Sequence, residues 1–387
     1  MNRKRIAVFM GTRPEAIKLA PVIQALRESD AFECTVIATG QHREMFRQVT
    51  DQFGVKVDVN LDVMRPNQTL AGLTARLMEG IDPYLEELRP DLVLVQGDTT
   101  TVFVAALASF YRRIPVGHVE AGLRTGNIWS PFPEEVNRRL ATPVVTLHFA
   151  PTESARAELL REGVDDKTIT VSGNTVIDAL LTEVRNQELP EVSIAIDLEL
   201  KDLLGENWRE RPMVLITGHR RENFGDGIEQ ICFAITHLAN RFSDHQFVYP
   251  VHLNPNVRTH VNRLLGKLPN VSLISPQGYR IFVALMRQSR LILTDSGGVQ
   301  EEAPSLGKPV LVMRDTTERP EGVEAGTALL TGPNADNIVA HAARLLADPI
   351  SYERMATAKN PYGDGKASMR IRNAIDEFFK ENASRSP

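Results

Sequence analysis

The sequence predicts an α/β protein built from two Rossmann-like, doubly wound domains. Short apolar runs alternate with longer amphipathic segments, several runs are apolar on successive residues, and the two halves repeat one order of motifs. Successive apolar residues, as in Leu92–Val95, are typical of parallel strands covered by helices on both faces. At ~100–200 residues per domain, the 387 residues suffice for two or three domains.

Ten segments are expected to form strands. Those of the first half are Arg5–Met10, Cys34–Thr39, Leu92–Gln96, Val116–Glu120 and Leu147–Ala150. Those of the second half are Met213–Thr217, Phe247–Pro250, Val271–Ile274, Leu291–Thr294 and Pro309–Met313. The polar, acidic stretch Asn186–Pro212 has weak periodicity and is expected to connect the domains.

Two helices are predicted from apolar spacing. The segment Gln68–Leu88 carries apolar residues three and four apart, which favours core packing, with a subunit interface as the alternative. Beyond the turn that begins at Pro361, a last helix places Ile371, Ile375 and Phe378 on one face.

The halves also resemble each other at their strand ends. In both, a strand runs into G-x-R-x-E and then a helix, at Gly11–Glu15 and at Gly218–Glu222. Leu92–Gln96 leads to Gly97-Asp98, much as Leu291–Thr294 leads to Asp295 and the small residues after it. This order suggests two units whose strand carboxyl ends face one cleft.

Composition excludes several classes of protein. Hydrophobic residues make up 42% and charged residues 24%, an ordinary globular balance. The net charge of −5 gives no positive field for nucleic acid, and no apolar run approaches the ~18 residues of a membrane span. Cys34 and Cys232 cannot form a disulfide scaffold and fit a reducing compartment. The N-terminal apolar run is too short for a signal peptide, so a soluble, cytoplasmic protein is expected.

The usual cofactor motifs are missing. No G-x-G-x-x-G follows a strand, Gly363–Lys366 lacks Walker A spacing, and no H-E-x-x-H pair exists. The sequence therefore predicts neither a dinucleotide cofactor nor a metal site.

The segment Thr294–Glu302 is a candidate anion site. It places Ser296, Gly297 and Gly298 where a strand hands over to a helix, so free backbone N–H groups could bind phosphate. Glu302, one turn further on, could reach a ribose diol. A tight strand–helix turn is an equal alternative.

Cations follow the first strand. Arg13 and Lys18 lie beyond its carboxyl end, which hints at an anionic ligand, with solubilising charges as the alternative. The segment Gly218–Glu222 repeats this pattern with His219, which could donate to phosphate.

Carboxylates are the most informative feature. Asp98 and Glu120 end neighbouring predicted strands, and Glu134 and Glu135 follow a proline-bounded loop. Acids at adjacent strand ends are expected to converge and to raise one another's pKa, which would supply a proton donor and a proton acceptor. Helix capping by Asp98 is the structural alternative.

Together these segments resemble one family, the non-hydrolysing UDP-N-acetylglucosamine 2-epimerases. The matching segments, in one order over nearly the whole chain, are Gly11–Lys18, Gln41–Arg43, Gly97–Thr100, His118–Thr125, Pro131–Glu135, Gly173–Asp178, Gly218–Asn223, Pro250–Pro255, Asp295–Pro304 and Lys308–Pro320. The connector and the C-terminal tail contribute little to the match.

The resemblance implies a glycosyltransferase-B-like fold with the active site in the interdomain cleft, and a homodimer. The expected domains are 1–172 with a returning C-terminal helix 366–387, and a UDP-binding domain 173–365. The implied reaction is reversible conversion of UDP-N-acetylglucosamine to UDP-N-acetylmannosamine through 2-acetamidoglucal and UDP, without NAD or metal. Its product would supply bacterial surface polysaccharide.

The resemblance also assigns roles to residues. Asp98, Glu120 and Glu134 match the acid/base carboxylates, and His219 matches the leaving-group histidine. The nucleotide-sugar contacts would be Arg13, Lys18, Gln277, Phe282, Ser296, Gly297, Gly298, Glu302 and Arg319. A second, activating UDP-N-acetylglucosamine would contact Gln41, His42, Arg220 and His252.

Three other functions compete with this one. A hydrolysing relative would release N-acetylmannosamine and UDP, and a glycosyltransferase would pass the sugar to an acceptor. A non-enzymatic nucleotide-sugar sensor would not need three carboxylates at strand ends.

Overall fold

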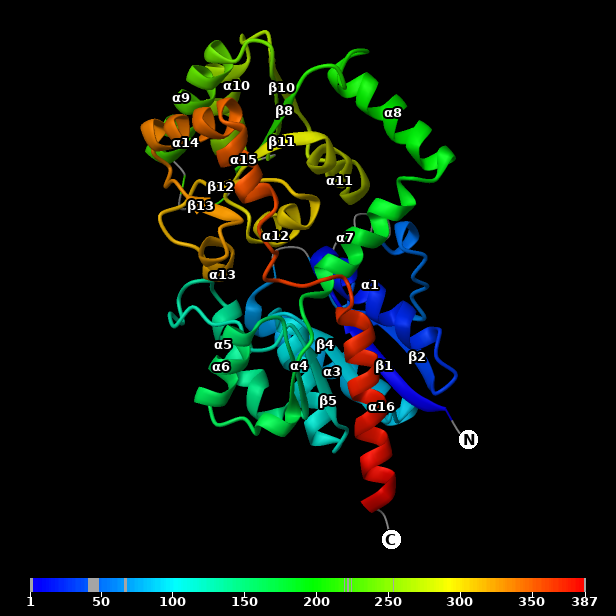
Figure 1. Cartoon of the computed structure of the whole chain (residues 1–387). Helices are drawn as coiled ribbons and strands as arrows, with labels where there is room; N and C mark the ends of the chain where they lie inside the picture. Colours follow the sequence, from blue (N-terminus) through cyan, green and yellow to red (C-terminus); the bar gives the residue numbers. More distant parts are fainter. Residues whose placement is uncertain are drawn as a thin grey trace. The chain divides into compact units, whose positions relative to one another are not determined.

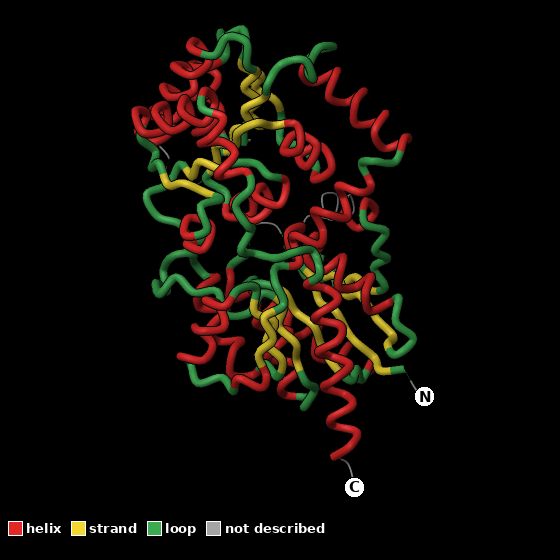
Figure 2. The backbone as a smooth tube through the Cα atoms, in the orientation of Figure 1, coloured by secondary structure: helices red, strands yellow, loops and turns green. Residues whose placement is uncertain are grey.

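The computed structural model describes residues 3–40, 49–65, 68–218, 220, 223, 225–252 and 254–385. The chain divides into two compact units, unit 1 (Met1–Ala179 with Tyr362–Pro387) and unit 2 (Leu180–Pro361). Each unit contains a parallel sheet whose strands alternate with helices along the chain (Figure 1; Figure 2). The predicted fold class, two Rossmann-like α/β domains, is confirmed.

The sheet of unit 1 has the strand order β3-β2-β1-β4-β5-β6-β7 within the described residues. Its strands are β1 (Lys4–Met10), β2 (Phe32–Ala38), β3 (Val59–Asn60), β4 (Leu92–Gln96), β5 (Val116–Val119), β6 (Leu147–Ala150) and β7 (Ile169–Val171). The five strands predicted for this half are present, with ends shifted by at most two residues. Strands β3 and β7 were not predicted, because runs of two or three residues show no periodicity.

The helices of unit 1 are α1 (Arg13–Arg27), α3 (Leu70–Leu88), α4 (Thr100–Tyr111), α5 (Glu134–Ala141), α6 (Glu153–Arg161), α7 (Thr175–Asn186), which continues into unit 2, and α16 (Ala367–Arg385). Four of them, α1, α3, α4 and α6, begin after a threonine that caps them. Thr69 and Thr99 cap α3 and α4 with their side chains. The buried stripe of α3 belongs to the hydrophobic core of unit 1, as the core-packing interpretation predicts.

The C-terminal helix belongs to unit 1 although it follows unit 2 in the chain. The Asp178 carboxylate accepts the backbone N–H groups of Ala367 and Ser368 at 3.1 and 2.9 Å, which anchors the start of α16. Further along, Ile371 and Ile375 are fully buried. The helix contacts α1, so segments from the two ends of the chain pack together.

The sheet of unit 2 has the order β10-β9-β8-β11-β12-β13 in the described chain. Its strands are β8 (Met213–Thr217), β9 (Gln246–Pro250), β10 (Val271–Ile274), β11 (Ser289–Thr294), β12 (Val310–Val312) and β13 (Ala328–Leu330). The five predicted strands are present, and β13, only three residues long, was missed. Both sheets thus place their first and fourth main strands side by side, β1 beside β4 and β8 beside β11.

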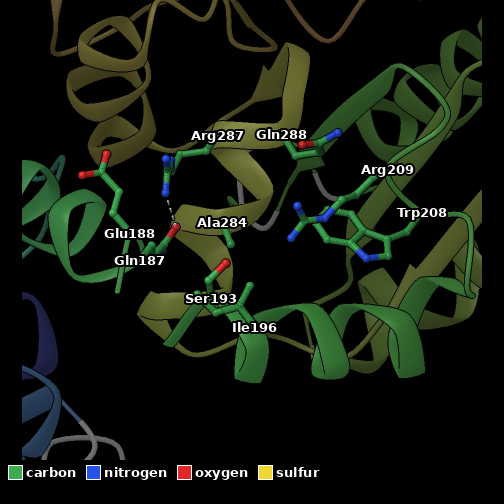
Figure 3. Close-up of a pocket in the computed structure, with 9 residues that line it drawn as sticks. All are labelled: Gln187, Glu188, Ser193, Ile196, Trp208, Arg209, Ala284, Arg287 and Gln288. Atoms are coloured by element: carbon green, nitrogen blue, oxygen red, sulfur yellow. Dashed lines mark hydrogen bonds between the residues drawn. The ribbon is translucent and has the colours of Figure 1, made fainter. Parts of the chain in front are cut away.

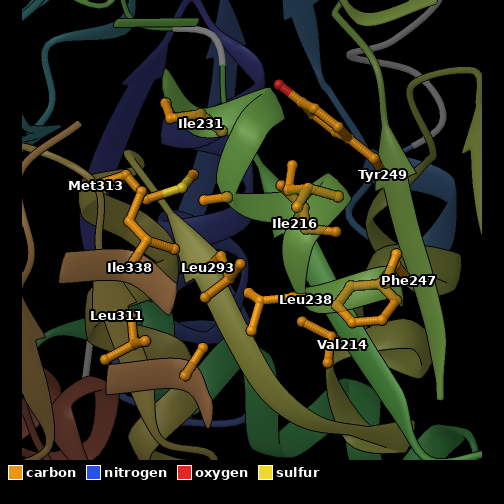
Figure 4. Packing of buried hydrophobic residues seen from close by; sticks show 14 of the residues in the cluster. Val214, Ile216, Ile231, Leu238, Phe247, Tyr249, Leu293, Leu311, Met313 and Ile338 are labelled. Carbon is orange, nitrogen blue, oxygen red and sulfur yellow. The ribbon is translucent and has the colours of Figure 1, made fainter. Parts of the chain in front are cut away.

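The helices of unit 2 are α8 (Pro190–Leu204), α9 (Asp226–Arg241), α10 (Pro255–Leu265), α11 (Tyr279–Gln288), α12 (Gly297–Glu302), α13 (Pro320–Glu324), α14 (Ala335–Ala347) and α15 (Pro349–Ala356). Of these, α9, α10, α14 and α15 contribute to the apolar core that Figure 4 shows in part. The core joins Phe247 of β9 and Leu293 of β11 to Leu238 of α9 and Ile338 of α14.

The expected connector Asn186–Pro212 contains a helix of 15 residues, α8. Pro190 lies in its first turn, where its missing N–H is harmless. Only Ile196 and Leu200 of this helix are buried, which explains why its apolar periodicity is weak in the sequence. Among the described residues, no helix is long and apolar enough to cross a bilayer.

We expect Gly122→Ala to destabilise unit 1 strongly. Gly122 has φ +88°, and an added Cβ would lie 2.2 Å from the Ala155 carbonyl oxygen. Backbone strain and overpacking together should lower the free energy of unfolding by about 3 kcal/mol or more, measured by urea denaturation. Gly163→Ala is the matched control, because φ is +87° but no atom lies within 4 Å of the new Cβ. It should cost only about 1–2 kcal/mol; equal losses would contradict the packing argument.

Candidate functional site

The strand order locates a candidate site in each unit. In open α/β sheets, ligands bind beyond the carboxyl ends of the strands where the strand order reverses. This switch point lies between β1 and β4 in unit 1 and between β8 and β11 in unit 2. Among the predicted site residues, Asp98, Arg220 and Ser296 lie in the loops that directly follow β4, β8 and β11.

Glu15 ties together the loops after β1 and β4. Its buried carboxylate accepts the backbone N–H groups of Gly11 and Thr12 at 2.9 and 2.6 Å and the Thr99 hydroxyl at 2.7 Å. Burial raises its pKa, although these hydrogen bonds oppose the shift. A Cβ on Gly11 would lie 2.6 Å from the Thr39 hydroxyl, so only glycine fits there. The loop that leads into α1 at Arg13 and the loop that carries Asp98 are therefore fixed to each other.

Asp98 is held by helix α5. Its carboxylate accepts the Arg138 guanidinium at 2.5 Å, and its backbone carbonyl accepts the Asn137 amide at 2.9 Å. The side chain is 28% exposed, so it remains reachable by a ligand. Thr99, not Asp98, caps α4, which makes the capping interpretation of Asp98 wrong.

Glu120 lies directly after β5 with an unusual backbone. Its φ is +67°, in the left-handed region of backbone conformation. This conformation costs a non-glycine residue of order 1–3 kcal/mol, and residues that adopt it occur often at functional sites. Its buried carboxylate accepts the Lys18 ammonium at 2.6 and 2.7 Å, and it also binds the Gln96 and Asn174 amides. A side-chain carbon built on Gly97 would lie 4.0 Å from Glu120 Oε2, so the β4 loop and Glu120 are neighbours.

Each of two predicted acids of unit 1 is paired with a cation. Asp98 pairs with Arg138 and Glu120 pairs with Lys18. Glu134, the first residue of α5, is partly exposed, whereas Glu135 is fully buried. The sequence predicts that the carboxylates affect mainly one another. It does not predict the ion pairs with Arg138 and Lys18.

In unit 2, the loop after β11 carries the predicted anion site. Ser296 precedes α12 without capping it through its side chain, and Gly297 and Gly298 form the first turn. The Arg319 guanidinium lies 3.7 Å from where a Gly297 Cβ would be, and it is ion-paired with Glu301. Backbone N–H groups and a guanidinium thus meet at one place, as a phosphate site requires.

Glu302 is oriented by a buried tyrosine. The Tyr279 hydroxyl donates to Glu302 Oε1 at 2.6 Å, and burial raises the tyrosine pKa, with the neighbouring carboxylate adding to the shift. Glu302 Oε2 lies 3.9 Å from the position of a Gly298 Cβ and so faces the start of α12.

Asp295 joins the two loops at the unit 2 switch point. Its carboxylate accepts the Arg220 backbone N–H at 2.8 Å and the Asn223 amide at 3.3 Å. Beneath it, the hydroxyls of Thr217 and Thr294 bond across β8 and β11 at 2.5 Å.

The remaining predicted residues are less well placed. His219, Gln41 and His42 lie outside the described residues. Gln277 donates to the Ser275 carbonyl and hydroxyl, and Phe282 is half-buried on α11. His252 is exposed, and its Nδ1 accepts the Asn254 backbone N–H at 3.2 Å.

Several supporting residues escaped sequence reasoning. They are Glu15, Gln96, Asn137, Arg138, Asn174, Tyr279 and Glu301. Arg138 could have been found, because it lies three and four residues after the two acids that begin α5. The contacts of Gln96 and Asn174 span 24 and 54 residues of sequence, and no local pattern encodes them.

A cavity of about 430 Å³ lies elsewhere in unit 2 (Figure 3). Its walls come from α8, α11 and the turn at Trp208 and Arg209. On one side of the cavity, the Arg287 guanidinium donates to the Gln187 side-chain oxygen at 3.1 Å. None of the predicted site residues lines it. Within the described residues, no group of three or more His, Cys, Asp or Glu side chains could hold a metal ion.

Two buried histidines lie on neighbouring strands beneath the unit 1 site. His118 of β5 and His148 of β6 are register partners. His118 Nε2 donates to the Gly97 carbonyl at 2.7 Å, next to Asp98. Burial lowers the pKa of each histidine to about 4, with the nearby Arg124 charge adding to the effect.

Comparisons with known proteins agree on one family. A family model described as UDP-N-acetylglucosamine 2-epimerase matches residues 24–376. UDP-N-acetylglucosamine 2-epimerases of Yersinia pestis and Escherichia coli K12 are each 54% identical, over 96% of this chain and 98% of theirs.

Solved structures give the same result. The crystal structure of a UDP-GlcNAc 2-epimerase from Neisseria meningitidis bound to UDP-GlcNAc has a TM-score of 0.89 and 48% identity, covering 97% of this chain and 100% of that one. A Methanocaldococcus jannaschii enzyme in complex with UDP-GlcNAc and UDP has a TM-score of 0.80 and 33% identity, over 96% and 99%.

We expect His118 and His148 to make stability pH-dependent. Their folded-state pKa of about 4 lies below the ordinary 6.5, so only the unfolded chain gains these protons between the two values. Stability should therefore fall as the pH drops from 7 to 5, by about 1–2 kcal/mol per histidine. The variant His118→Gln keeps a donor for the Gly97 carbonyl. In urea denaturation at a series of pH values, its free energy of unfolding should fall less steeply than that of the wild type between pH 7 and 5. Above pH 7 the two curves should be parallel. Identical slopes at pH 5–7 would contradict the assignment.

Proposed function

The chain belongs to the UDP-N-acetylglucosamine 2-epimerase family, and from this premise we propose that it interconverts UDP-N-acetylglucosamine and UDP-N-acetylmannosamine by eliminating and re-adding UDP, without net hydrolysis. The observation that carries the proposal is the pair of carboxylates Asp98 and Glu120. Each is fixed by its own cation at the carboxyl edge of one sheet.

The chemistry explains why such a pair is needed. The C2 hydrogen of the sugar has no adjacent carbonyl, so direct deprotonation is too slow. When UDP leaves C1, that carbon becomes cationic and the C2–H bond becomes acidic. A carboxylate can then take the proton and leave 2-acetamidoglucal, and return of a proton to the opposite face with re-addition of UDP inverts C2.

Unit 1 would supply the proton-transfer groups. Lys18 orients Glu120 by binding both of its oxygens, at 2.6 and 2.7 Å, and Arg138 orients Asp98. Glu134 begins α5 and is partly exposed, which suits a third acid/base group. Carboxylates that ion pairs already hold in position lose less entropy on reaching the reactive geometry.

Unit 2 would bind the nucleotide. The backbone at Ser296–Gly298 and the Arg319 guanidinium suit the diphosphate, whose negative charge grows as UDP leaves. The Glu302 oxygen that faces α12 suits the ribose diol. The roles of Arg13, Gln277, Phe282 and His219, and the activating site at Gln41, His42, Arg220 and His252, rest on the resemblance alone.

Proton NMR in deuterated water tests the reaction directly. Purified protein with UDP-N-acetylglucosamine should yield both epimers, each acquiring deuterium at C2, without added NAD or metal. Elimination requires this exchange because the proton reaches a carboxylate before it returns.

The same spectra separate the competing activities. Free N-acetylmannosamine as the main product would indicate the hydrolysing activity. Conversion only with an added acceptor would indicate a glycosyltransferase, and retention of protium at C2 in both epimers would contradict solvent-exchanging proton transfer.

Neutral isosteres test the carboxylates. Asp98→Asn, Glu120→Gln and Glu134→Gln should each lower kcat by roughly 10²–10⁴-fold, because they remove proton transfer but keep shape. UDP affinity, measured by calorimetry, should change little.

Asp58→Asn is the matched control for these variants. Asp58 is 29% exposed and pairs with Arg27 at 2.9 Å at the C-terminal end of α1, away from the strand carboxyl ends. It should keep wild-type kcat. If a carboxylate variant lost activity only with a collapsed melting temperature, a structural role would be supported for that residue.

A further inference from the structure

Helix α5 holds Asp98 through both its side chain and its backbone. Arg138 binds the carboxylate at 2.5 Å and Asn137 binds the carbonyl at 2.9 Å. Both donors are at least nine-tenths buried, at 6% exposure each. The same helix begins with Glu134, so its position determines where two of the proposed acid/base groups lie.

The acid behind this arrangement is Glu135, which is 0% exposed. Its carboxylate faces the Arg138 and Arg139 guanidinium groups, each at 3.3 Å. It also accepts the backbone N–H groups of Thr125 and Gly126 at 3.0 and 3.3 Å. A buried carboxylate needs such donors, and it in turn restricts where they can move. Arg138 is therefore held between two acids, one buried and one open to a ligand.

We propose that Glu135 is a positioning residue that sets the orientation of the Asp98 carboxylate through Arg138. This inference rests on the proposed function and adds to it a group that touches no substrate. The order Glu135–Arg138–Asp98 gives the reactive acid one fixed direction, because a guanidinium offers its donors in one plane.

A purely structural role is the competing explanation. Through Thr125 and Gly126, Glu135 also fixes the loop before α5, in which Thr125 donates to the Ser130 carbonyl at 2.7 Å. If Glu135 only held this loop, its loss would lower stability or substrate affinity whether or not Asp98 carried a charge. If it acts through Asp98, its loss should matter only while the Asp98 carboxylate is present.

A double-mutant cycle separates the two roles. Glu135→Gln keeps one acceptor oxygen for the loop but turns an amide N–H toward Arg138. In epimerisation assays, kcat should fall about 10–100-fold while KM changes less than about threefold. In the Asp98→Asn background, the same change should cost less than about threefold, because the two effects are coupled. Additive losses would overturn the inference.

Asp58→Asn provides the control cycle. Combined with Glu135→Gln, it should add its own small effect independently, because its partner Arg27 contacts neither α5 nor Asp98 in the described hydrogen bonds. If Glu135→Gln does not fold, as judged by circular dichroism, Arg138→Lys takes its place, since one ammonium cannot span both acids as the guanidinium does. The expected pattern is the same: a loss of kcat that vanishes with Asp98→Asn.

The outcomes also separate this inference from the proposed function. An active wild type with additive losses would overturn the inference alone. A wild type that turns over no UDP-N-acetylglucosamine would overturn the proposed function and the inference that rests on it.

Discussion

A buried carboxylate must be surrounded by donors, and in unit 1 this requirement determines how the loops at the strand ends are arranged. Glu15, Glu120 and Glu135 are at most 8% exposed. Each collects donors from different segments. Glu15 joins the loops after β1 and β4. Glu120 joins α1, β4 and the segment before α7, and Glu135 joins α5 to the loop before it. Because an unpaired buried charge would destabilise the fold by several kcal/mol, these loops cannot move independently.

The donors that surround the buried carboxylates also hold the two proposed reactive groups, Asp98 and Glu120. Asp98 accepts Arg138 but stays 28% exposed, and Glu120 keeps a positive φ that only strong local contacts can maintain. Proton transfer to a small substrate requires an accessible carboxylate whose orientation is fixed by the residues packed around it. In this arrangement Glu15 and Glu135 hold the loops in place, whereas Asp98 and Glu120 are the carboxylates proposed for proton transfer.

Unit 2 shows how one topology can carry different chemistry. Its strand order repeats that of the first six strands of the unit 1 sheet. A pair of threonine hydroxyls joins β8 to β11 in unit 2, and another pair, Thr39–Thr101, joins the residue after β2 to α4 in unit 1. The loop after β11 nevertheless presents small residues, next to which lies the Arg319 guanidinium from the segment before α13, whereas the loops after β4 and β5 present acids. The fold sets where a ligand binds, and the loop residues decide whether the site suits phosphate or proton transfer.

The sequence by itself determined the class of fold, ten of the strands and the loops that carry the candidate residues. These follow from local patterns: apolar runs of strand length, glycine and threonine at turns, and acids directly after strands. Only the tertiary structure decided which cation meets which acid, that Thr99 rather than Asp98 caps α4, and that Glu135 and Arg138 support Asp98. The physical reason is that these contacts join residues up to 102 positions apart, such as Lys18 and Glu120, and depend on strand order and side-chain direction, which no local spacing encodes.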